Sequence, residues 1–459
     1  MKNQIFFLIL FLLVSQVIFS AETIIGGRFD GAEGSRIRIL ANKDYITYEV
    51  HELASALAGN GGEFEIRLKH DRVIYAYILT GHYRGEIYLE PGREYFLSAD
   101  NLQIKDQFRP FYNQEQLQFR FANADDSDLN LLIRRFNSGF NDFVMTRFEE
   151  IYKQRNNALI DSLKEMRGSF AEFSDNAYFL HYMDYRIASV ELVIRSTVKH
   201  LLFRDYFQDK PVLYDHVEYM YFFNEFFNHY YNSSRFIDPV DIREALQKNG
   251  GYQTMDNIIG ADTLLTNERF RELVMLKMLF QLYYQPGFNT KAIEKILGTI
   301  EENSRFREHN KLATGILEKI NKFGRGSRAP EILIEREGTA DFRLSNFRGQ
   351  PVYIGFISLR SFGCLVELDT LDKLQDRFGD KVHFIILAFD EPELVRKYRQ
   401  DEAVNWILIA IKEGFNIVND YDIKTFPQFV LIDERGNIIS YPARKPSENI
   451  EYVLQKMLE

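Results

Sequence analysis

The period at which apolar residues recur changes twice along this chain of 459 residues, and each period favours a different secondary structure. Residues 22–105 carry short alternating or β-branched runs, such as IRIL and VIYAYIL, with turn sequences such as GNGG at 59–62 between them. Runs of this length that are separated by turn residues are typical of β-strands. We expect residues 22–105 to form a small antiparallel β-sandwich.

The middle segment, residues 110–325, has few prolines, and its apolar residues recur at helical spacing. The stretch RELVMLKMLFQLYY at 271–284 is a strong example. The most aromatic stretch, EYMYFFNEFFNHYY at 218–231, either lines a ligand groove or packs in a core, which is the usual place for aromatic stripes. We predict an all-α domain over residues 110–325.

The last segment follows a linker at 321–331 that contains two glycines and a proline. The continuous apolar runs at 351–357 and 382–389 are typical of buried central strands. Residues 428–441 have the pattern of a β-hairpin, and helical patterns lie between the strands. We predict an α/β domain with a mixed sheet over residues 326–459.

Residues 1–20 have the features of a signal peptide. Lys2 gives a positive start, residues 5–14 are almost wholly apolar, and Ser20 and Ala21 supply small residues for cleavage. An uncleaved anchor is the alternative, although the apolar run is short for a membrane span. We expect a periplasmic or otherwise exported protein with no stable membrane span after signal removal.

Composition and missing motifs exclude several functional classes. The formal net charge of −10 argues against a nucleic-acid partner, which would require a basic face. A single cysteine cannot form an internal disulfide, so core burial must hold the fold together. The histidines form no HExxH motif, and no phosphate-binding or nucleotide fingerprint is present. We therefore expect neither a metal site nor a cofactor.

Several short motifs, taken in order, make the last 130 residues or so resemble the TlpA-like branch of the thioredoxin superfamily. They are Ala329-Pro330, LSNFRGQPVYIGF from Leu344 to Phe356, SFGC from Ser361 to Cys364, and TFPQFVLIDERGNII from Thr425 to Ile439. In this resemblance SFGC falls where the family has C-x-x-C, and Pro427 is the cis-proline candidate. The order of export signal, β domain, helical region and C-terminal domain is also similar to that of secreted Bacteroidetes-type proteins.

The resemblance implies a thioredoxin fold, but three positions depart from the family pattern. Thiol–disulfide exchange needs two thiols, and Ser361 replaces the first, attacking cysteine. Arg360 stands where a tryptophan is usual, and Gly355 stands where the family often has a buried acid. We expect a degenerate, redox-inactive site at which Ser361 caps a helix.

Cys364 takes the place of the family's resolving cysteine, so we expect a covered and inert thiol. A thiol-disulfide oxidoreductase or a one-cysteine peroxidase that uses Cys364 remains an alternative. Ser361-x-x-Cys364 resembles the second half of the peroxiredoxin motif, but Ile357 stands at its proline position. Such a peroxidase would also need an arginine beside the thiolate, and Arg360 would have to supply it.

These observations favour a protein- or peptide-binding module. Pro427, Phe426 and Arg360 are the predicted contact residues at the cis-proline face, where backbone groups can pair with an extended peptide. Ser361 and Cys364 mark the degenerate catalytic position. A ligand-binding helical scaffold is a further alternative, which a deep aromatic-lined pocket with convergent polar groups would favour.

Overall fold

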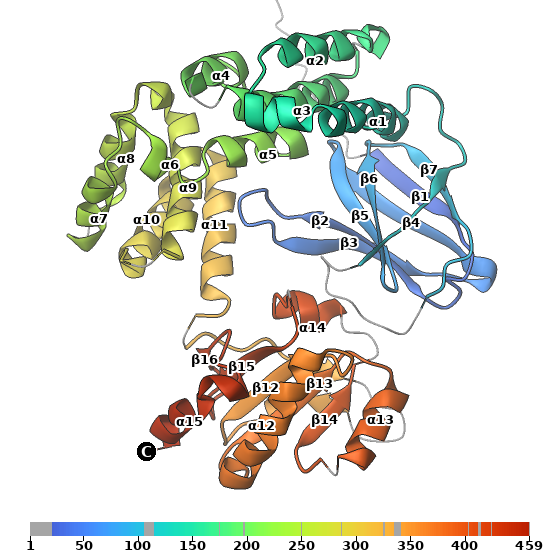
Figure 1. The fold of residues 1–459 in the computed structure, drawn as a ribbon, viewed down its shortest axis with the longest axis vertical. Coiled ribbons are helices and arrows are strands. Elements are labelled where there is room, and N and C mark those ends of the chain that lie inside the picture. Colours follow the sequence, from blue (N-terminus) through green and yellow to red (C-terminus); the bar gives the residue numbers. More distant parts are fainter. Residues whose placement is uncertain are drawn as a thin grey trace, which may run out of the picture.

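The computed structural model describes residues 21–104 and 114–458, except for positions 174, 196–197, 249, 286, 325, 335–340, 403, 412–414 and 424. The predicted signal at 1–20 lies outside the described residues. Figure 1 shows three parts in chain order, which are a strand-rich part, a helical part and a C-terminal α/β part. Among the described residues, no helix is long and apolar enough to cross a membrane.

The strand-rich part contains two sheets that share one core. The first sheet has the order β4 (Glu63–His70), β1 (Ala21–Phe29), β7 (Glu94–Ala99) and β9 (Arg120–Phe121). The second has the order β3 (Val50–Leu57), β2 (Arg36–Asn42), β5 (Ile74–Thr80), β6 (Tyr83–Leu89) and β8 (Glu115–Gln116). Ile25 of the first sheet and Ile37 and Ile78 of the second are fully buried in the same cluster.

The expectation of a purely antiparallel arrangement is wrong at two strand pairs. Strand β1 pairs with β7 in parallel, with Ile24 opposite Glu94, and β6 pairs with β8 in parallel. Neither pair is joined by a tight hairpin, which is the connection that makes neighbouring strands antiparallel. Strands β2 to β6 lie between β1 and β7 in the sequence, and this long connection allows β7 to run either parallel or antiparallel to β1.

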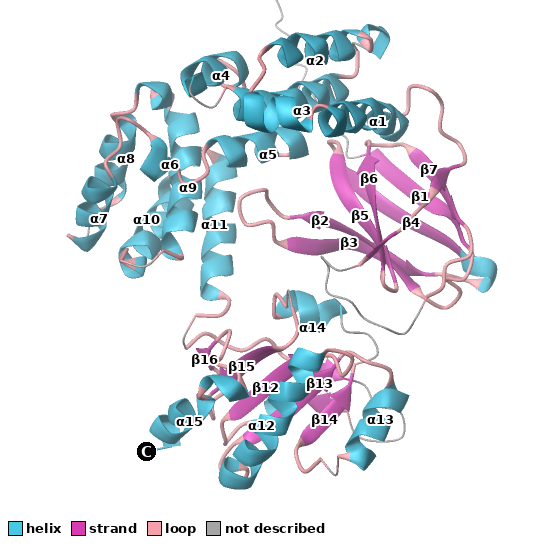
Figure 2. Cartoon of the chain, viewed as in Figure 1, coloured by secondary structure: helices cyan, strands magenta, loops and turns pink. Residues whose placement is uncertain are grey.

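Helices make up the regular structure of the described residues from Leu129 to Asn321 (Figure 2). The predicted all-α segment 110–325 starts too early, because β8 and β9 within it are strands of the two sheets. They are α1 (Leu129–Thr146), α2 (Ala158–Gly168), α3 (Ala177–Ile194), α4 (Lys199–Tyr206), α5 (Val217–Phe226), α6 (Tyr230–Ser233), α7 (Pro239–Gln247), α8 (Tyr252–Gly260), α9 (Glu268–Tyr283), α10 (Thr290–Asn303) and α11 (Arg307–Asn321). Asp128 caps the N-terminus of α1, where its side chain accepts hydrogen bonds from the backbone N–H groups of Asn130 and Leu131. Asn267 caps α9, where its side chain accepts one from the backbone N–H of Phe270.

The aromatic stretch at 218–231 packs inside the helical part. Phe222, Phe223 and Phe226 are fully buried in its largest core cluster, so the interpretation of this stretch as core is confirmed. Asn224 in the same helix donates a hydrogen bond from Nδ2 to the backbone oxygen of Tyr45, at 2.6 Å. That contact joins α5 to the strand-rich part.

The C-terminal part is built on a five-stranded mixed sheet. Its order is β14 (Ile407–Ala410), β13 (His383–Ala388), β12 (Val352–Ile357), β15 (Gln428–Ile432) and β16 (Ile438–Ser440). Strands β12, β13 and β14 run parallel, and β15 and β16 form the antiparallel half. The predicted mixed sheet is confirmed. Helices α12 (Phe362–Phe378), α13 (Pro392–Asp401), α14 (Phe415–Asp420) and α15 (Ile450–Leu458) accompany it, and two further short strands are β10 (Leu333–Ile334) and β11 (Phe342–Arg343).

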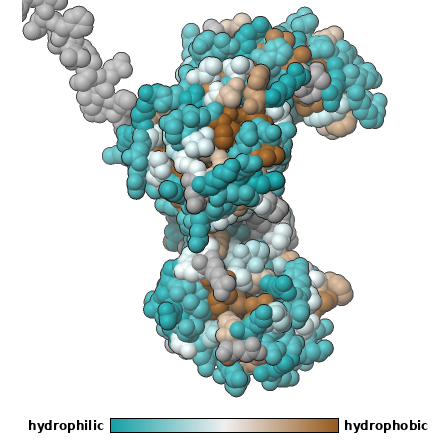
Figure 3. All heavy atoms as spheres, turned by 90° about the vertical axis from the view of Figure 1, so that its left-hand side faces the viewer, coloured by the Kyte–Doolittle hydropathy of each residue, from teal (hydrophilic) through white to brown (hydrophobic). Residues whose placement is uncertain are grey.

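The segment predicted as a linker, 321–331, packs against the C-terminal part. The Phe323 ring lies 4.3 Å from the Tyr441 ring, measured between centroids. The backbone N–H of Gly326 donates to the oxygen of Ile438 at 2.7 Å, so the linker covers the outer edge of β16. Figure 3 shows the C-terminal part as a separate lobe below the larger one.

Candidate functional site

Cys364 lies in the first turn of α12, directly after the loop that leaves β12. Its side chain has no exposed surface and belongs to a core cluster with Leu368 and Leu371 of the same helix. Burial raises the pKa of the Cys364 thiol, and the nearby Asp390 carboxylate adds to that rise. Hydrogen bonds from the Ser358 backbone and the Ser361 side chain oppose the shift but do not reverse it. The site therefore disfavours the thiolate, which is the reactive form.

Ser361 occupies the N-cap position of α12, with φ −97° and ψ 118°. Its carbonyl oxygen accepts hydrogen bonds from the backbone N–H groups of Cys364, at 3.0 Å, and Leu365, at 3.2 Å. The hydroxyl, however, makes no capping hydrogen bond to the helix. The position was predicted correctly, but the expected side-chain cap is absent because the hydroxyl interacts with the Cys364 thiol instead.

Arg360 is paired with two acidic side chains. Its side chain is 56% exposed, and Nη2 contacts both carboxylate oxygens of Glu391, at 3.0 and 2.8 Å. The Arg360 Nε also lies 3.9 Å from Asp390 Oδ1. A guanidinium held by these two acids gives no support to the one-cysteine peroxidase alternative, which needs an arginine beside the thiolate.

Asp390 is a buried acid that the sequence interpretation missed. It directly follows β13 and accepts hydrogen bonds from the Leu359 backbone N–H, at 2.6 Å, and the Ser358 hydroxyl, at 3.0 Å. Burial raises the pKa of Asp390. Because ligand crevices lie at the carboxyl ends of parallel strands, an acid directly after the apolar run at 382–389 was a usable signal.

Gly355 lies on β12 in the centre of the sheet, where no space is left for a side chain. A Cβ atom there would lie 2.6 Å from Ile386 Cδ1 and 2.6 Å from Phe429 Cε1. The neighbouring side chains therefore fill the volume that an acid would need at this position.

Phe426 and Pro427 lie directly before β15, and the peptide bond between them is cis. The Phe426 ring stacks on Phe389, with centroids 5.1 Å apart, and is half-buried. Both residues line a cleft of about 1,330 Å³ between the C-terminal part, the helical part and the loop between β2 and β3.

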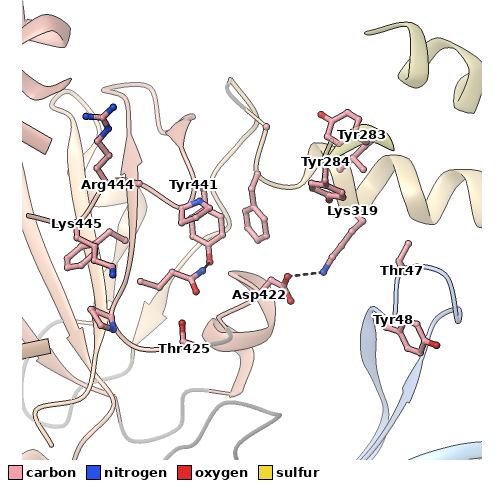
Figure 4. Close-up of a pocket in the computed structure, with 18 of the residues that line it drawn as sticks. Thr47, Tyr48, Tyr283, Tyr284, Lys319, Asp422, Thr425, Tyr441, Arg444 and Lys445 are labelled. Carbon is pink, nitrogen blue, oxygen red and sulfur yellow. Dashed lines mark hydrogen bonds and ion pairs between the residues drawn. The ribbon is translucent and has the colours of Figure 1, made fainter. Parts of the chain in front are cut away.

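Tyrosines from all three parts of the chain line this interdomain cleft (Figure 4). Tyr48 comes from the β2–β3 loop, Tyr283 and Tyr284 come from the end of α9, and Tyr441 follows β16. Lys319 of α11 bridges the cleft to Asp422, with Nζ 3.1 Å from Oδ2. These charges and rings give the cleft both apolar surface and polar contacts.

The structure brings only part of the predicted site together. Phe426 and Pro427 line the interdomain cleft, whereas Ser361, Cys364 and the predicted contact residue Arg360 are absent from the described residues that line it. Phe426 also packs against the buried cluster that contains Cys364, so the cleft wall lies beside the degenerate catalytic position.

Residues 325–441 match the family model of the AhpC/TSA family. The C-terminal part is a TlpA-like thioredoxin domain. Thioredoxin-like protein YneN of Bacillus subtilis is 23% identical over 137 residues, which cover 29% of this chain and 75% of that protein. Thiol-disulfide oxidoreductase ResA of Halalkalibacterium halodurans is 26% identical over 115 residues, which cover 25% of this chain and 65% of that protein.

The similar solved structures also cover less than a third of this chain. The thioredoxin domain of a thiol-disulfide oxidoreductase from Bacteroides vulgatus is 22% identical, with a TM-score of 0.27, over 30% of this chain and 99% of that one. A thiol:disulfide interchange protein from a Bacteroides species is also 22% identical, with a TM-score of 0.27, over 29% of this chain and 90% of that one.

Proposed function

We propose that this chain is an exported thioredoxin-like protein that binds polypeptide segments in the interdomain cleft and does not catalyse thiol–disulfide exchange. The observation that carries this proposal is the complete burial of Cys364, which is the only cysteine in the chain. Exchange requires an accessible thiolate and a second thiol that resolves the mixed disulfide. The thioredoxin-like domain offers neither at Ser361 and Cys364.

The dimensions and lining of the cleft support a polypeptide as the occupant. Its volume of about 1,330 Å³ exceeds the roughly 300–1,000 Å³ that is typical of small-molecule pockets. Tyr284 is 58% exposed and Tyr48 is 38% exposed, so apolar rings with polar tips are available to a partner. Thr425, Phe426 and Pro427 place the backbone before β15 along the same wall.

The cleft beside the cis-proline is also a better docking place for a peptide than the edge of the sheet, because the linker already occupies the edge at β16. The linker pairs with β16 through Gly326 and Ile438, so a peptide cannot extend the sheet there without displacing the linker. We therefore place the partner in the cleft, against the segment from Thr425 to Pro427 and the tyrosines opposite it.

Binding is tested with peptides selected on the immobilised full chain from a phage-displayed library of random peptides. Tyr284→Glu introduces a charge into the cleft and should weaken binding of the selected peptides by about tenfold or more. Tyr452→Glu is the matched control, because Tyr452 is 51% exposed on α15 and does not line the cleft. The proposal is wrong if no peptide is enriched, or if the two variants weaken binding equally.

The absence of exchange chemistry is tested separately by the reduction of insulin in the presence of dithiothreitol. We expect no turnover above the rate with dithiothreitol alone, and the same result for Cys364→Ala. Turnover that depends on Cys364 would show that the thioredoxin-like domain is an enzyme.

A further inference from the structure

A second cleft, of about 860 Å³, lies between the second sheet and helices α1, α3 and α5. It is remote in the sequence from the thioredoxin-like domain and contains none of the predicted site residues. Arginine, glutamate, asparagine and tyrosine side chains from both parts of the chain line it. Ligand pockets form preferentially at such junctions between domains.

The helical wall of this polar cleft is held by hydrogen bonds between neighbouring helices. Asn137 of α1 donates from Nδ2 to the Tyr182 oxygen of α3 at 2.8 Å. Arg186 of α3 donates from Nη2 to Asn141 Oδ1 at 3.2 Å, and its guanidinium lies 4.8 Å from the centre of the Phe140 ring. These contacts fix the positions of the polar groups before any ligand arrives.

Arg186 nevertheless keeps one donor unused. Its Nε is buried, and the described part of the chain offers this atom no hydrogen-bond acceptor. The nearest carboxylate oxygen is Oε1 of Glu218, at 4.0 Å, which is too far for a hydrogen bond. The Glu218 side chain is itself only 12% exposed. A buried donor and a buried carboxylate thus face each other without a direct hydrogen bond.

We propose that this polar cleft binds a carbohydrate, with a sugar hydroxyl accepting from Arg186 Nε and donating to Glu218. A hydroxyl is the simplest group that accepts and donates at once, so it satisfies both side chains. Glu218 and Glu86 line the cleft together with Arg84, Arg134 and Arg186, so charges of both signs surround the ligand and it needs no net charge of its own. The half-buried Tyr75 ring supplies an apolar face for the C–H groups of a sugar.

The test uses the full chain on an array of neutral and uronate-containing oligosaccharides, followed by calorimetry with the best ligand. We expect a dissociation constant below about 1 mM for at least one saccharide. At pH 8, above the raised pKa of Glu218, Glu218→Gln removes the charged acceptor and should weaken that binding by about tenfold or more. Glu225→Gln is the matched control, because Glu225 is exposed on the same helix α5 and does not line the cleft.

The carbohydrate proposal fails if no saccharide binds, or if Glu218→Gln and Glu225→Gln have equal effects. It also fails if the array selects only ligands whose binding survives Glu218→Gln. Tyr284→Glu, which alters the interdomain cleft, should leave saccharide binding unchanged. The failure of one proposed binding site would therefore leave the other proposal unaffected.

Discussion

Replacing the buried acid of α5, Glu218→Gln, should change how stability depends on pH. Burial raises the pKa of Glu218 from 4.5 to about 7, while Arg186 and Tyr182 act in the opposite direction and the Glu86 charge adds a smaller rise. In the unfolded chain the pKa returns to its ordinary value, so the folded state holds a proton that the unfolded state releases between pH 4.5 and 7.

The sign of the effect follows from that difference. Because the folded pKa is raised, the free energy of unfolding falls as pH rises from about 4.5 to 7, and the loss is complete above pH 7. A difference between 4.5 and about 7 corresponds to about 3 kcal/mol. Glutamine cannot ionise, so Glu218→Gln should become more stable relative to the wild type by about that amount across this window.

Urea unfolding followed by far-ultraviolet circular dichroism measures the effect at several pH values from 4.5 to about 8. The quantity of interest is the difference in the free energy of unfolding between Glu218→Gln and the wild type, because other titrating groups cancel in it. Glu225→Gln controls for the removal of a carboxylate from the same helix. A difference that stays constant between pH 4.5 and 7.5 would refute the assignment of a raised pKa to Glu218.

Three further substitutions test the packing that supports the site. Gly355→Ala places a methyl group 2.6 Å from two buried side chains and should lower the free energy of unfolding by about 1–3 kcal/mol; an unchanged urea midpoint would contradict this. Asn224→Ala removes the hydrogen bond to Tyr45 and should cost about 1–3 kcal/mol, with a loss below about 0.3 kcal/mol as the contrary result. Arg360→Ala removes an exposed pair with Glu391 and should cost less than about 1 kcal/mol in thermal unfolding, so a larger loss would show an unrecognised role.

The fold of the thioredoxin-like domain could be predicted because its signals are local. The apolar run at 351–357 predicts a buried strand on its own, and the residues around Pro427 form one continuous motif. The parallel pairing of β1 with β7 could not be predicted, because it depends on two segments that are far apart in the chain. Local pattern carries no information about such long-range pairing.

The candidate sites were predictable only in part, because they too combine residues that are far apart in the chain. Ser361 and Cys364 share a motif, and their place at the start of α12 follows from it. The interdomain cleft combines Tyr48, Tyr284 and Pro427, which come from three separate parts of the chain. Only the tertiary structure brings such residues to one surface, and only the tertiary structure shows that the Ser361 hydroxyl leaves the helix uncapped.

The most direct test of the central claim is the rate at which DTNB modifies Cys364 in the native chain and in denaturing guanidinium chloride. A side chain with no exposed surface reacts only after the structure opens, and an opening free energy of about 4 kcal/mol or more would slow the reaction about a thousandfold. We predict a slowing of at least that size for the native protein. Equal rates in the native and denatured states would show that Cys364 is accessible and would contradict the assignment of this domain to binding rather than thiol chemistry.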